Sequence, residues 1–532
     1  IQTAIDDALS GDTIRAWSGT YYENIEIKAL IHSDGIILEG NGTSTIITVD
    51  VSDSGFGSPP IANSSRAGIS VSGSHNIGIS NLLVSNFTHG IYVEDTYNTD
   101  ISNIQIRDIG SEGIQISNSE DVGIVGLHIE SDGSFGVNVS SNSPNFEMSD
   151  TVITGFSEGV VINSEDAYLH NITAFGNDRS GCYVLADGIT LSGSTLNDNG
   201  INGIKLQGVT SATIDHNTIF DNGQAEIYVQ SSYNVDIYDN SISDDISAGF
   251  GIKTPGSGDL KIYRNEMELS IHLSASDSQI FENNFVNITG DPPHTDYDDV
   301  AIVLSGSYNI ISDNSIHNAN VGFIFLYGDY DYNMVENNTL TLVSDDLWYY
   351  TSGKNNTFIN TDLDVIDIGE DGYFQTHNYV DIEMLTVNGP AVGVEMDVRY
   401  KGGSSIYSTE GYAGFDLTTD SSGNIERLFI IHKVFDDNYV PDVMETEITY
   451  YYDGVEYTID LDTSTSHIER IWVNLRPISS IDSVNGFGDI QSTVNVEEAV
   501  KGADFVLEDS HTIAYWPFDE GGGSQVYATG YQ

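Results

Sequence analysis

The sequence predicts an all-β fold built as a solenoid, and three observations support this. A short phrase of the form Gly-apolar-x-apolar recurs between residues 68 and 325. The second residues of successive phrases lie 22, 23, 23, 23, 22, 22, 23, 25, 19, 31 and 21 residues apart, and a period in the twenties is typical of a solenoid. Within each unit, apolar and polar residues alternate over four or five positions, which indicates half-buried strands and not helices.

The second residue of each phrase is predicted to face inward, so that these residues stack in one column. Cys182 fills the position that Ile or Val fills in neighbouring units, and we expect it to be a small buried hydrophobe. The column is Ile69, Ile91, Ile114, Val137, Val160, Cys182, Ile204, Ile227 and Ile252.

A second column repeats with the same irregular spacing. Each member is an Asn that stands three positions after an apolar residue, and the steps are 23, 25, 18, 31 and 23. We interpret the column as a structural ladder, in which stacked amides at a tight turn bond the coils above and below. Its expected members are Asn217, Asn240, Asn265, Asn283, Asn314 and Asn337.

With these repeats the chain resembles the right-handed parallel β-helix family, the repeat type of pectate-lyase-like proteins. Its opening, Ile1 to Ala8 followed by Gly11-Asp12-Thr13-Ile14, is similar to the capping helix and first coil of that family. The resemblance covers residues 1–375 and implies a right-handed parallel β-helix with an N-terminal capping helix. It implies no particular activity, because such a scaffold carries many activities.

After the solenoid the pattern changes. Residues 376–476 contain longer alternating strands and a hairpin signal at residues 419–424, and they resemble a small immunoglobulin-like or carboxypeptidase-regulatory-like β-sandwich. Residues 477–510 are interpreted as a linker. Residues 511–532 contain the run Trp516-Pro517-Phe518-Asp519-Glu520-Gly521, which is similar to the first strand of laminin-G or concanavalin-A-like domains. We therefore expect the truncated start of such a domain and a fragment of a longer protein.

The charge balance narrows the possible partners. The chain carries 80 acidic and 17 basic residues, a net charge of −63, so it should repel nucleic acid and anionic lipid. No run of about 18 apolar residues predicts a membrane span. We expect an extracellular protein, secreted or at the cell surface, in a salty medium.

The third residue of each phrase should face outward and form a straight column on the solenoid. Tyrosines, amides and cations in line suit an extended sugar chain, whereas the alternative is an ordinary solvated strand face in which Tyr is favoured by propensity. The candidate glycan-binding residues are Tyr92, Gln115, Asn138, Tyr183, Lys205, Tyr228 and Lys253.

Catalysis on such a chain would need further groups. A hydrolase needs two carboxylates about 5 to 9.5 Å apart, and Glu112 and Glu158 stand two coils apart at roughly this spacing. A lyase or epimerase acting on uronates needs a cation and a base, for which Lys205, Lys253, Arg264 and His272 are the candidates.

The widest step in the repeat contains a loop rich in Asp, His and Tyr, residues 290–299. It resembles the Asp-Pro-His-Glu loop of alginate epimerases, although the second Pro before His294 and the Thr at 295 depart from that pattern. A solvated loop, a calcium site and a catalytic role remain open, and no other cofactor is expected. The possible calcium ligands are Asp291, Asp296, Asp298 and Asp299.

Two functions follow from these patterns. The first is a non-catalytic protein that binds a polysaccharide or cell-surface glycan and mediates adhesion. The second is a carbohydrate-active enzyme, a lyase, epimerase or hydrolase, that acts on an acidic polysaccharide.

The excess of 80 acidic residues over 17 basic ones leads to a prediction about salt. Self-repulsion should destabilise the fold at low ionic strength, and added salt or divalent cations should restore the stability by screening. Thermal unfolding from very low to molar salt checks this, and an unchanged melting temperature would contradict it.

Overall fold

The computed structural model describes residues 1–28, 35–49, 67–244, 249–288, 299–370, 372–386, 388–403, 406–408, 417–425, 427–436 and 441–473, with three short strands after them. The chain divides into two compact units, the first comprising Ile1–Phe374 with Phe435–Tyr439 and the second the remaining residues from Gln375 onward.

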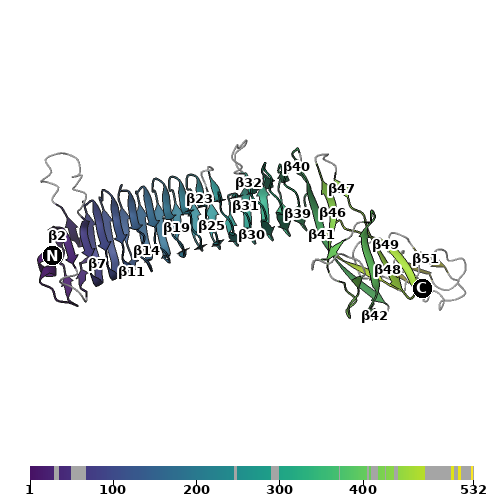
Figure 1. Ribbon diagram of the computed structural model, residues 1–532, viewed down its shortest axis with the longest axis horizontal. Coiled ribbons are helices and arrows are strands. Elements are labelled where there is room, and N and C mark those ends of the chain that lie inside the picture. The colour runs from purple at the N-terminus through teal and green to yellow at the C-terminus, as the bar shows by residue number, and fades with distance from the viewer. Residues whose placement is uncertain are drawn as a thin grey trace. The chain divides into compact units, whose positions relative to one another are not determined.

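The first unit is a solenoid whose coils each contribute one strand to a continuous parallel sheet, here called the long sheet (Figure 1). A strand of one coil pairs directly with its equivalent in the next, which confirms the all-β solenoid. The long sheet has 15 strands: β3 (Ile25–Lys28), β6 (Ala67–Ser72), β8 (His89–Glu94), β10 (Glu112–Ser117), β13 (Phe135–Val139), β15 (Glu158–Ile162), β17 (Ser180–Val184), β20 (Asn202–Gln207), β23 (Ala225–Gln230), β26 (Phe250–Lys253), β29 (Ile271–Leu273), β32 (Val300–Leu304), β35 (Val321–Phe325), β38 (Asp345–Tyr349) and β40 (Ile366–Ile368).

Two further rows of strands complete each coil. One row runs through β18 (Ile189–Ser192), β21 (Ala212–Asp215), β24 (Val235–Tyr238), β27 (Lys261–Tyr263), β30 (Gln279–Phe281), β33 (Ile310–Ser312), β36 (Met334–Glu336) and β39 (Asn356–Ile359). The other runs through β19 (Thr195–Asn197), β22 (Thr218–Phe220), β25 (Ser241–Ser243), β28 (Glu266–Met267), β31 (Asn284–Ile288), β34 (Ser315–Ala319) and β37 (Thr339–Thr341).

In the earlier coils four longer strands each extend through both rows, namely β7 (His75–Ser85), β9 (Tyr97–Arg107), β14 (Glu147–Thr154) and β16 (Tyr168–Phe175). The other strands of the two rows in these coils are short and separate: β1 (Thr13–Arg15), β2 (Gly19–Tyr22), β4 (Ile37–Glu39), β5 (Thr45–Thr48), β11 (Glu120–Val125) and β12 (His128–Glu130). A five-residue helix, α1 (Gln2–Asp6), precedes them and buries Ile5. It is the one α-helix in the described part of the chain, and its capping role remains a prediction.

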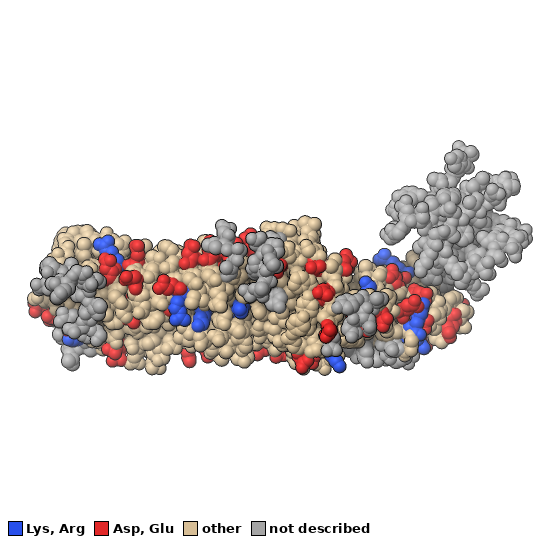
Figure 2. All heavy atoms as spheres, turned by 90° about the horizontal axis from the view of Figure 1, so that it is seen from above, with Lys and Arg blue, Asp and Glu red and all other residues tan. Residues whose placement is uncertain are grey.

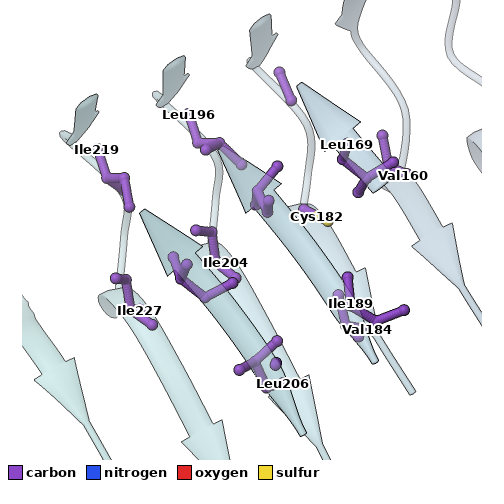
Figure 3. Packing of buried hydrophobic residues seen from close by; sticks show 14 of the residues in the cluster. Val160, Leu169, Cys182, Val184, Ile189, Leu196, Ile204, Leu206, Ile219 and Ile227 are labelled. Carbon is purple, nitrogen blue, oxygen red and sulfur yellow. The ribbon is translucent and has the colours of Figure 1, made fainter. Parts of the chain in front are cut away.

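The inward column predicted from the repeats is confirmed. Ile114, Val137, Val160, Cys182 and Ile204 pair in register from strand to strand. All nine members are buried, Cys182 at 2% exposure and the others at 0%, and Figure 3 shows Val160, Cys182, Ile204 and Ile227 in successive coils. Burial raises the pKa of the Cys182 thiol to about 12, so this cysteine is an unreactive core side chain.

The Asn ladder is present and fully hydrogen-bonded. In each coil from Asn217 to Asn314, the backbone N–H and the Nδ2 of one Asn both donate to the Oδ1 of the Asn in the next coil, at 2.9 to 3.0 Å. Two other ladders run parallel to it, one through Asn177, Asn199 and Asn222 and one through Asn309, Asn333 and Asn356.

One predicted ladder member was off by a residue. Asn338, not Asn337, accepts the bonds from Asn314, and Asn338 is buried. Asn337 lies at the adjacent corner with φ +53° and accepts a bond from Asn360. The corners of the solenoid need a residue in this left-handed region in almost every coil, and Asn and Asp tolerate it because a short polar side chain bonds locally. This requirement accounts for much of the Asn and Asp in the sequence.

Glu226 is an exception to the pattern of the repeats. It stands where neighbouring coils have the Gly of the phrase, it is fully buried, and it ends the ladder of Asn177, Asn199 and Asn222. The backbone N–H of Asn222 donates to its Oε1 at 3.1 Å, and the Nδ2 of Asn222 donates to its Oε2. Burial raises the pKa of the Glu226 carboxyl to about 8.

The second unit has its own hydrophobic core, which includes Ile382, Val398, Ile430 and Ile448. An antiparallel sheet has the order β45 (Leu417–Thr418), β43 (Glu395–Tyr400), β48 (Thr446–Tyr452) and β49 (Val455–Leu461). The other strands are β41 (Phe374–Thr386), β42 (Gly389–Pro390), β44 (Tyr407–Ser408), β46 (Leu428–Phe435), β47 (Asp442–Val443) and β50 (His467–Trp472).

The finer identity of this region remains a prediction. A three-stranded sheet of β51 (Phe505–Glu508), β52 (Ile513–Trp516) and β53 (Thr529–Gly530) is found near the end of the chain. The immunoglobulin-like and laminin-G-like assignments, and the boundaries at 375, 476 and 510, are expectations from sequence. No helix among the described residues is long and apolar enough to cross a membrane.

The ladder leads to a stability prediction. Replacing Asn283 by Ala leaves the backbone N–H of Asn265 without an acceptor in the core, and removes one of the two acceptors of the Asn265 Nδ2. The Ile262 carbonyl and the Asn314 Oδ1 also lose the bonds that they accept from the Asn283 Nδ2. The free energy of unfolding should fall by at least about 2 kcal/mol, since each unsatisfied buried polar group costs about 1 to 3 kcal/mol. Asn284→Ala is the matched control, because Asn284 is the next residue in the chain and is exposed. Equal denaturant midpoints for the two variants would contradict the structural role of the ladder.

Glu226 leads to a prediction about pH. Because its folded pKa of about 8 lies above the usual value of 4.5, the unfolded state loses the proton first. The contribution of Glu226 to stability is therefore greatest at low pH, falls between about pH 4.5 and 8, and is constant above that. Since one pKa unit corresponds to about 1.4 kcal/mol, the protein should lose a few kcal/mol relative to Glu226→Gln over this range. Stability curves of the two proteins that run parallel across this pH range would argue against it.

Candidate functional site

The predicted outward column lies on the outer face of the long sheet. Its members pair in register, with Val161 between Asn138 and Tyr183 and with His272 following Lys253. All seven predicted residues are half-buried, so they are less exposed than expected, and Val161 is buried. We call this surface the outer column: Tyr92, Gln115, Asn138, Val161, Tyr183, Lys205, Tyr228, Lys253 and His272.

Side chains of the outer column bond to side chains of neighbouring coils. The Asn138 Nδ2 donates to the Gln115 Oε1 at 2.9 Å, and the Tyr183 hydroxyl donates to the Gln207 Oε1 at 2.7 Å. The Lys205 Nζ lies 4.4 Å from the centroid of the Tyr183 ring, within range of a cation–π contact. These contacts hold the side chains in place, but they also cover one face of Tyr183.

Glu158 lies beside this column and is held by two groups. The residue is 3% exposed, its Oε1 is 3.2 Å from the Arg179 Nε, and its Oε2 accepts a bond from the Ser180 backbone N–H at 2.9 Å. Burial raises the pKa of the Glu158 carboxyl, while Ser180, Arg179 and Lys205 oppose that rise. Glu158 therefore fixes Arg179, whose side chain remains 54% exposed, at the edge of the column.

Glu112 has a different partner. Its Oε2 is 2.5 Å from the His89 Nδ1, and both side chains are largely buried. Burial alone would raise the pKa of the Glu112 carboxyl, but bonds with His89 and Ser111 lower it below its usual value. Phe135 pairs with Glu112 on one side and with Glu158 on the other, so its strand separates them. The two carboxylates thus lie two coils apart, as the repeat predicts, and each is paired with a basic side chain of its own.

Lys253 and His272 meet around an aromatic ring. The Lys253 Nζ lies 4.3 Å from the centroid of the Phe250 ring, and the His272 ring lies 5.3 Å from Phe250. Burial, with a smaller effect of Lys253, lowers the pKa of His272 to about 4, so its imidazole is neutral at pH 7. The Nδ1 of His272 is buried and has no hydrogen-bond partner among the described residues. Arg264, the other candidate cation, lies elsewhere, at the end of β27 in a bidentate pair with Asp239.

Cations gather on this side of an otherwise acidic protein. Arg179, Lys205 and Lys253 lie on or beside the outer column, although the chain has 17 basic residues in 532. Figure 2 shows a row of blue areas along the middle of the solenoid, between red areas. Sequence reasoning missed Arg179, Phe250 and Gln207, because their roles depend on contacts between coils.

The polar column ends at His272. The next members are Val303 and Ile324, which are fully buried and pack with Val300 and Val321 in a small cluster of their own. The absence of alternation in the phrases at 302–304 and 323–325 is a sequence signal that could have revealed this.

The predicted calcium site falls largely outside the described residues, which exclude Asp291, Asp296 and Asp298. Asp299 is described, and its Oδ2 lies 3.4 Å from the Asn320 Nδ2. Within the described ranges, no three His, Cys, Asp or Glu side chains are grouped so as to hold a metal ion.

Comparison with known proteins identifies the repeat. The family model described as "Right handed beta helix region" matches residues 18–174 and 180–363. No curated protein matches the chain.

Several solved structures are similar to the chain. The A-module of a mannuronan C-5 epimerase of Azotobacter vinelandii has 17% identity and a TM-score of 0.40, covering 67% of this chain and 94% of that one. The Dettilon tailspike protein has 12% identity and a TM-score of 0.38, covering 73% and 75%. A variant tailspike of E. coli bacteriophage HK620 in complex with pentasaccharide has 11% identity and a TM-score of 0.35, covering 87% and 89%. At these identities the similarities concern the fold alone.

Proposed function

The chain belongs to the right-handed beta-helix family, and on that premise we propose that it is an extracellular, non-catalytic protein that binds an extended polysaccharide along the outer column. The observation that carries the proposal is the register of Tyr183, Lys205, Tyr228 and Lys253 on four successive strands. Equivalent positions repeat about every 4.8 Å, so a linear polymer can meet several of these residues at once. Weak contacts at each coil then add together.

The charge of the site favours a glycan with anionic groups. Arg179, Lys205 and Lys253 provide positive charge where the remaining chain is strongly negative. The amides of Gln115 and Asn138 and the hydroxyl of Tyr183 supply hydrogen-bonding groups that suit sugar hydroxyls. Nucleic acid is a poor alternative polyanion, because its denser charge would be repelled by the net charge of −63.

The arrangement of the carboxylates supports a binding role over a catalytic one. Glu112 is paired with His89, and Glu158 is almost fully buried beside Arg179, so contacts within the protein account for both carboxylates. A lyase or epimerase is the second candidate, because His272, whose buried Nδ1 has no hydrogen-bond partner among the described residues, and Lys253 both lie against the Phe250 ring, and a base next to a cation suits proton abstraction from a uronate. Calcium bound through residues 291–299 remains a proposal for either function.

Binding measurements on the outer column test the proposal. Tyr183→Ala combined with Tyr228→Ala should weaken binding to an acidic polysaccharide by about 1 to 3 kcal/mol in total, because two aromatic contacts are lost while the core is untouched. Lys205→Met should weaken it further and flatten its dependence on salt. Affinity electrophoresis against a panel of soluble polysaccharides measures both effects.

A matched control and a counter-result complete this test. Tyr263→Ala removes a half-buried tyrosine from the row of β27, outside the long sheet, and should leave binding unchanged. Absence of binding to every acidic polysaccharide would refute the proposal. Product formation that Lys253→Met or His272→Ala abolishes while binding persists would establish the enzyme instead.

A further inference from the structure

A second surface of aromatic side chains lies beyond the outer column, in the coils of β35 and β38. The Tyr327 and Tyr350 rings stack with centroids 5.2 Å apart and planes 10° apart, and the Trp348 ring lies 6.4 Å from Tyr350 at 43°. We call Tyr327, Trp348 and Tyr350 the aromatic platform. It is not a part of the core, because Phe325 and Tyr349 occupy the inward positions of these strands.

Contacts with the buried cluster and with neighbouring residues hold the aromatic platform in place. Trp348 pairs in register with Ile324 and packs against the buried cluster of Val300, Val303, Val321 and Ile324. The Tyr350 hydroxyl donates to the Asp367 Oδ2 at 2.8 Å. A side chain added at Gly369 would come within 3.0 Å of the Tyr350 ring, so the chain passes directly beside it. Ordering these rings on binding therefore costs little conformational entropy.

Tyr327 is the solvent-exposed ring of the stacked pair. Its side chain is 73% exposed although its ring rests on Tyr350. In the preceding coil, Ser305 and Gly306 follow β32, and neither residue carries a bulky side chain. A second stacked pair, Tyr308 and Tyr332, lies at the following corner one coil earlier, in the coils of β32 and β35, with 55% and 51% exposure. Several fixed and exposed rings at one end of a solenoid mark a binding surface.

The charge around the aromatic platform selects the kind of ligand. Residues 299–370 contain eleven acidic residues and one basic residue, Lys354. Asp367 bonds Tyr350 directly, and Asp329 accepts a bond from Ser352 at 2.6 Å in the loop that follows Tyr327. An anionic sugar would be repelled here, whereas carboxylates accept hydrogen bonds from neutral sugar hydroxyls while the apolar face of a pyranose covers a ring.

From these observations we infer that the aromatic platform is a second carbohydrate-binding site, specific for uncharged pyranose units. It is distinct from the outer column, since the buried Val303 and Ile324 separate the two along the sheet. Four coil steps lead from Lys253 to Trp348, a distance of about 19 Å at about 4.8 Å per step. The protein thus has one surface suited to anionic sugars and another suited to neutral ones.

The test uses the whole chain and two soluble probes, a neutral galactomannan and an acidic polyuronate, in affinity electrophoresis. Tyr327→Ala should weaken binding of the neutral polymer at least about fivefold and leave the acidic one unchanged. Because Tyr327 is exposed, this variant should fold normally, whereas Trp348→Ala removes a residue packed on the buried cluster. Tyr233→Ala is the matched control, since Tyr233 is 45% exposed and has no ring partner among the described residues.

The outcomes separate this inference from the proposed function. Loss of neutral binding in Tyr327→Ala, together with its retention in the Tyr183 and Tyr228 double variant, supports the second site even if no acidic polymer binds. Equal neutral binding by Tyr327→Ala and Tyr233→Ala, or no neutral binding at all, overturns it. Displacement of the neutral polymer by millimolar choline would also overturn it, because the rings and carboxylates would then be a cation site.

Discussion

The fold depends on the hydrogen bonds that join each coil to the next in exact register. In the Asn ladders one Oδ1 accepts two bonds from the coil before it, and the Nδ2 of the same residue also donates to a backbone carbonyl, as Asn283 does to Ile262. Each buried amide is therefore satisfied only if the coil above and the coil below are both in place. A shift of one residue in any coil would leave several polar groups unpaired in the core, which is costly. This constraint aligns the outward side chains, including those of both candidate sites.

The ladders also explain how a chain with a charge of −63 holds together. The polar groups in the core are amides and hydroxyls, which bond across coils without adding charge, and the carboxylates lie mostly outside. Glu226 departs from this rule, and its raised pKa shows how it is accommodated: as a neutral acid at the end of a ladder. On this acidic exterior a few cations create a local region of positive potential. Lys205 and Lys253 therefore have a large effect on which ligands the outer column attracts.

Much of the solenoid could be predicted from the sequence, because a repeat shows its inward positions directly. Cys182 was placed correctly since it shares a column with Ile and Val. The error at Asn337 arose where Met334-Val335 and Asn337-Asn338 offer two equivalent registers, and only the corner geometry distinguishes them. Glu226 was missed because its coil lacks the glycine that identified the others. Of the candidate site, the column itself was predictable, but the pairing of Glu158 with Arg179 was not, since that contact joins residues 21 apart in sequence and depends on side-chain conformation.

The two proposed surfaces follow from the same property of a solenoid. Each coil adds one side chain to an outward column. The chemistry of the column at any point along the axis is therefore set by the residue that the local coil places there. Between Tyr183 and His272 the column combines hydroxyl, ammonium and imidazole groups; at Val303 and Ile324 it becomes apolar and buried; at Trp348 it becomes aromatic, next to Tyr350 and Tyr327. A polymer lying along the axis would meet these zones in sequence. The buried zone keeps them apart, so their specificities can differ while the distance between them stays fixed by the coil spacing.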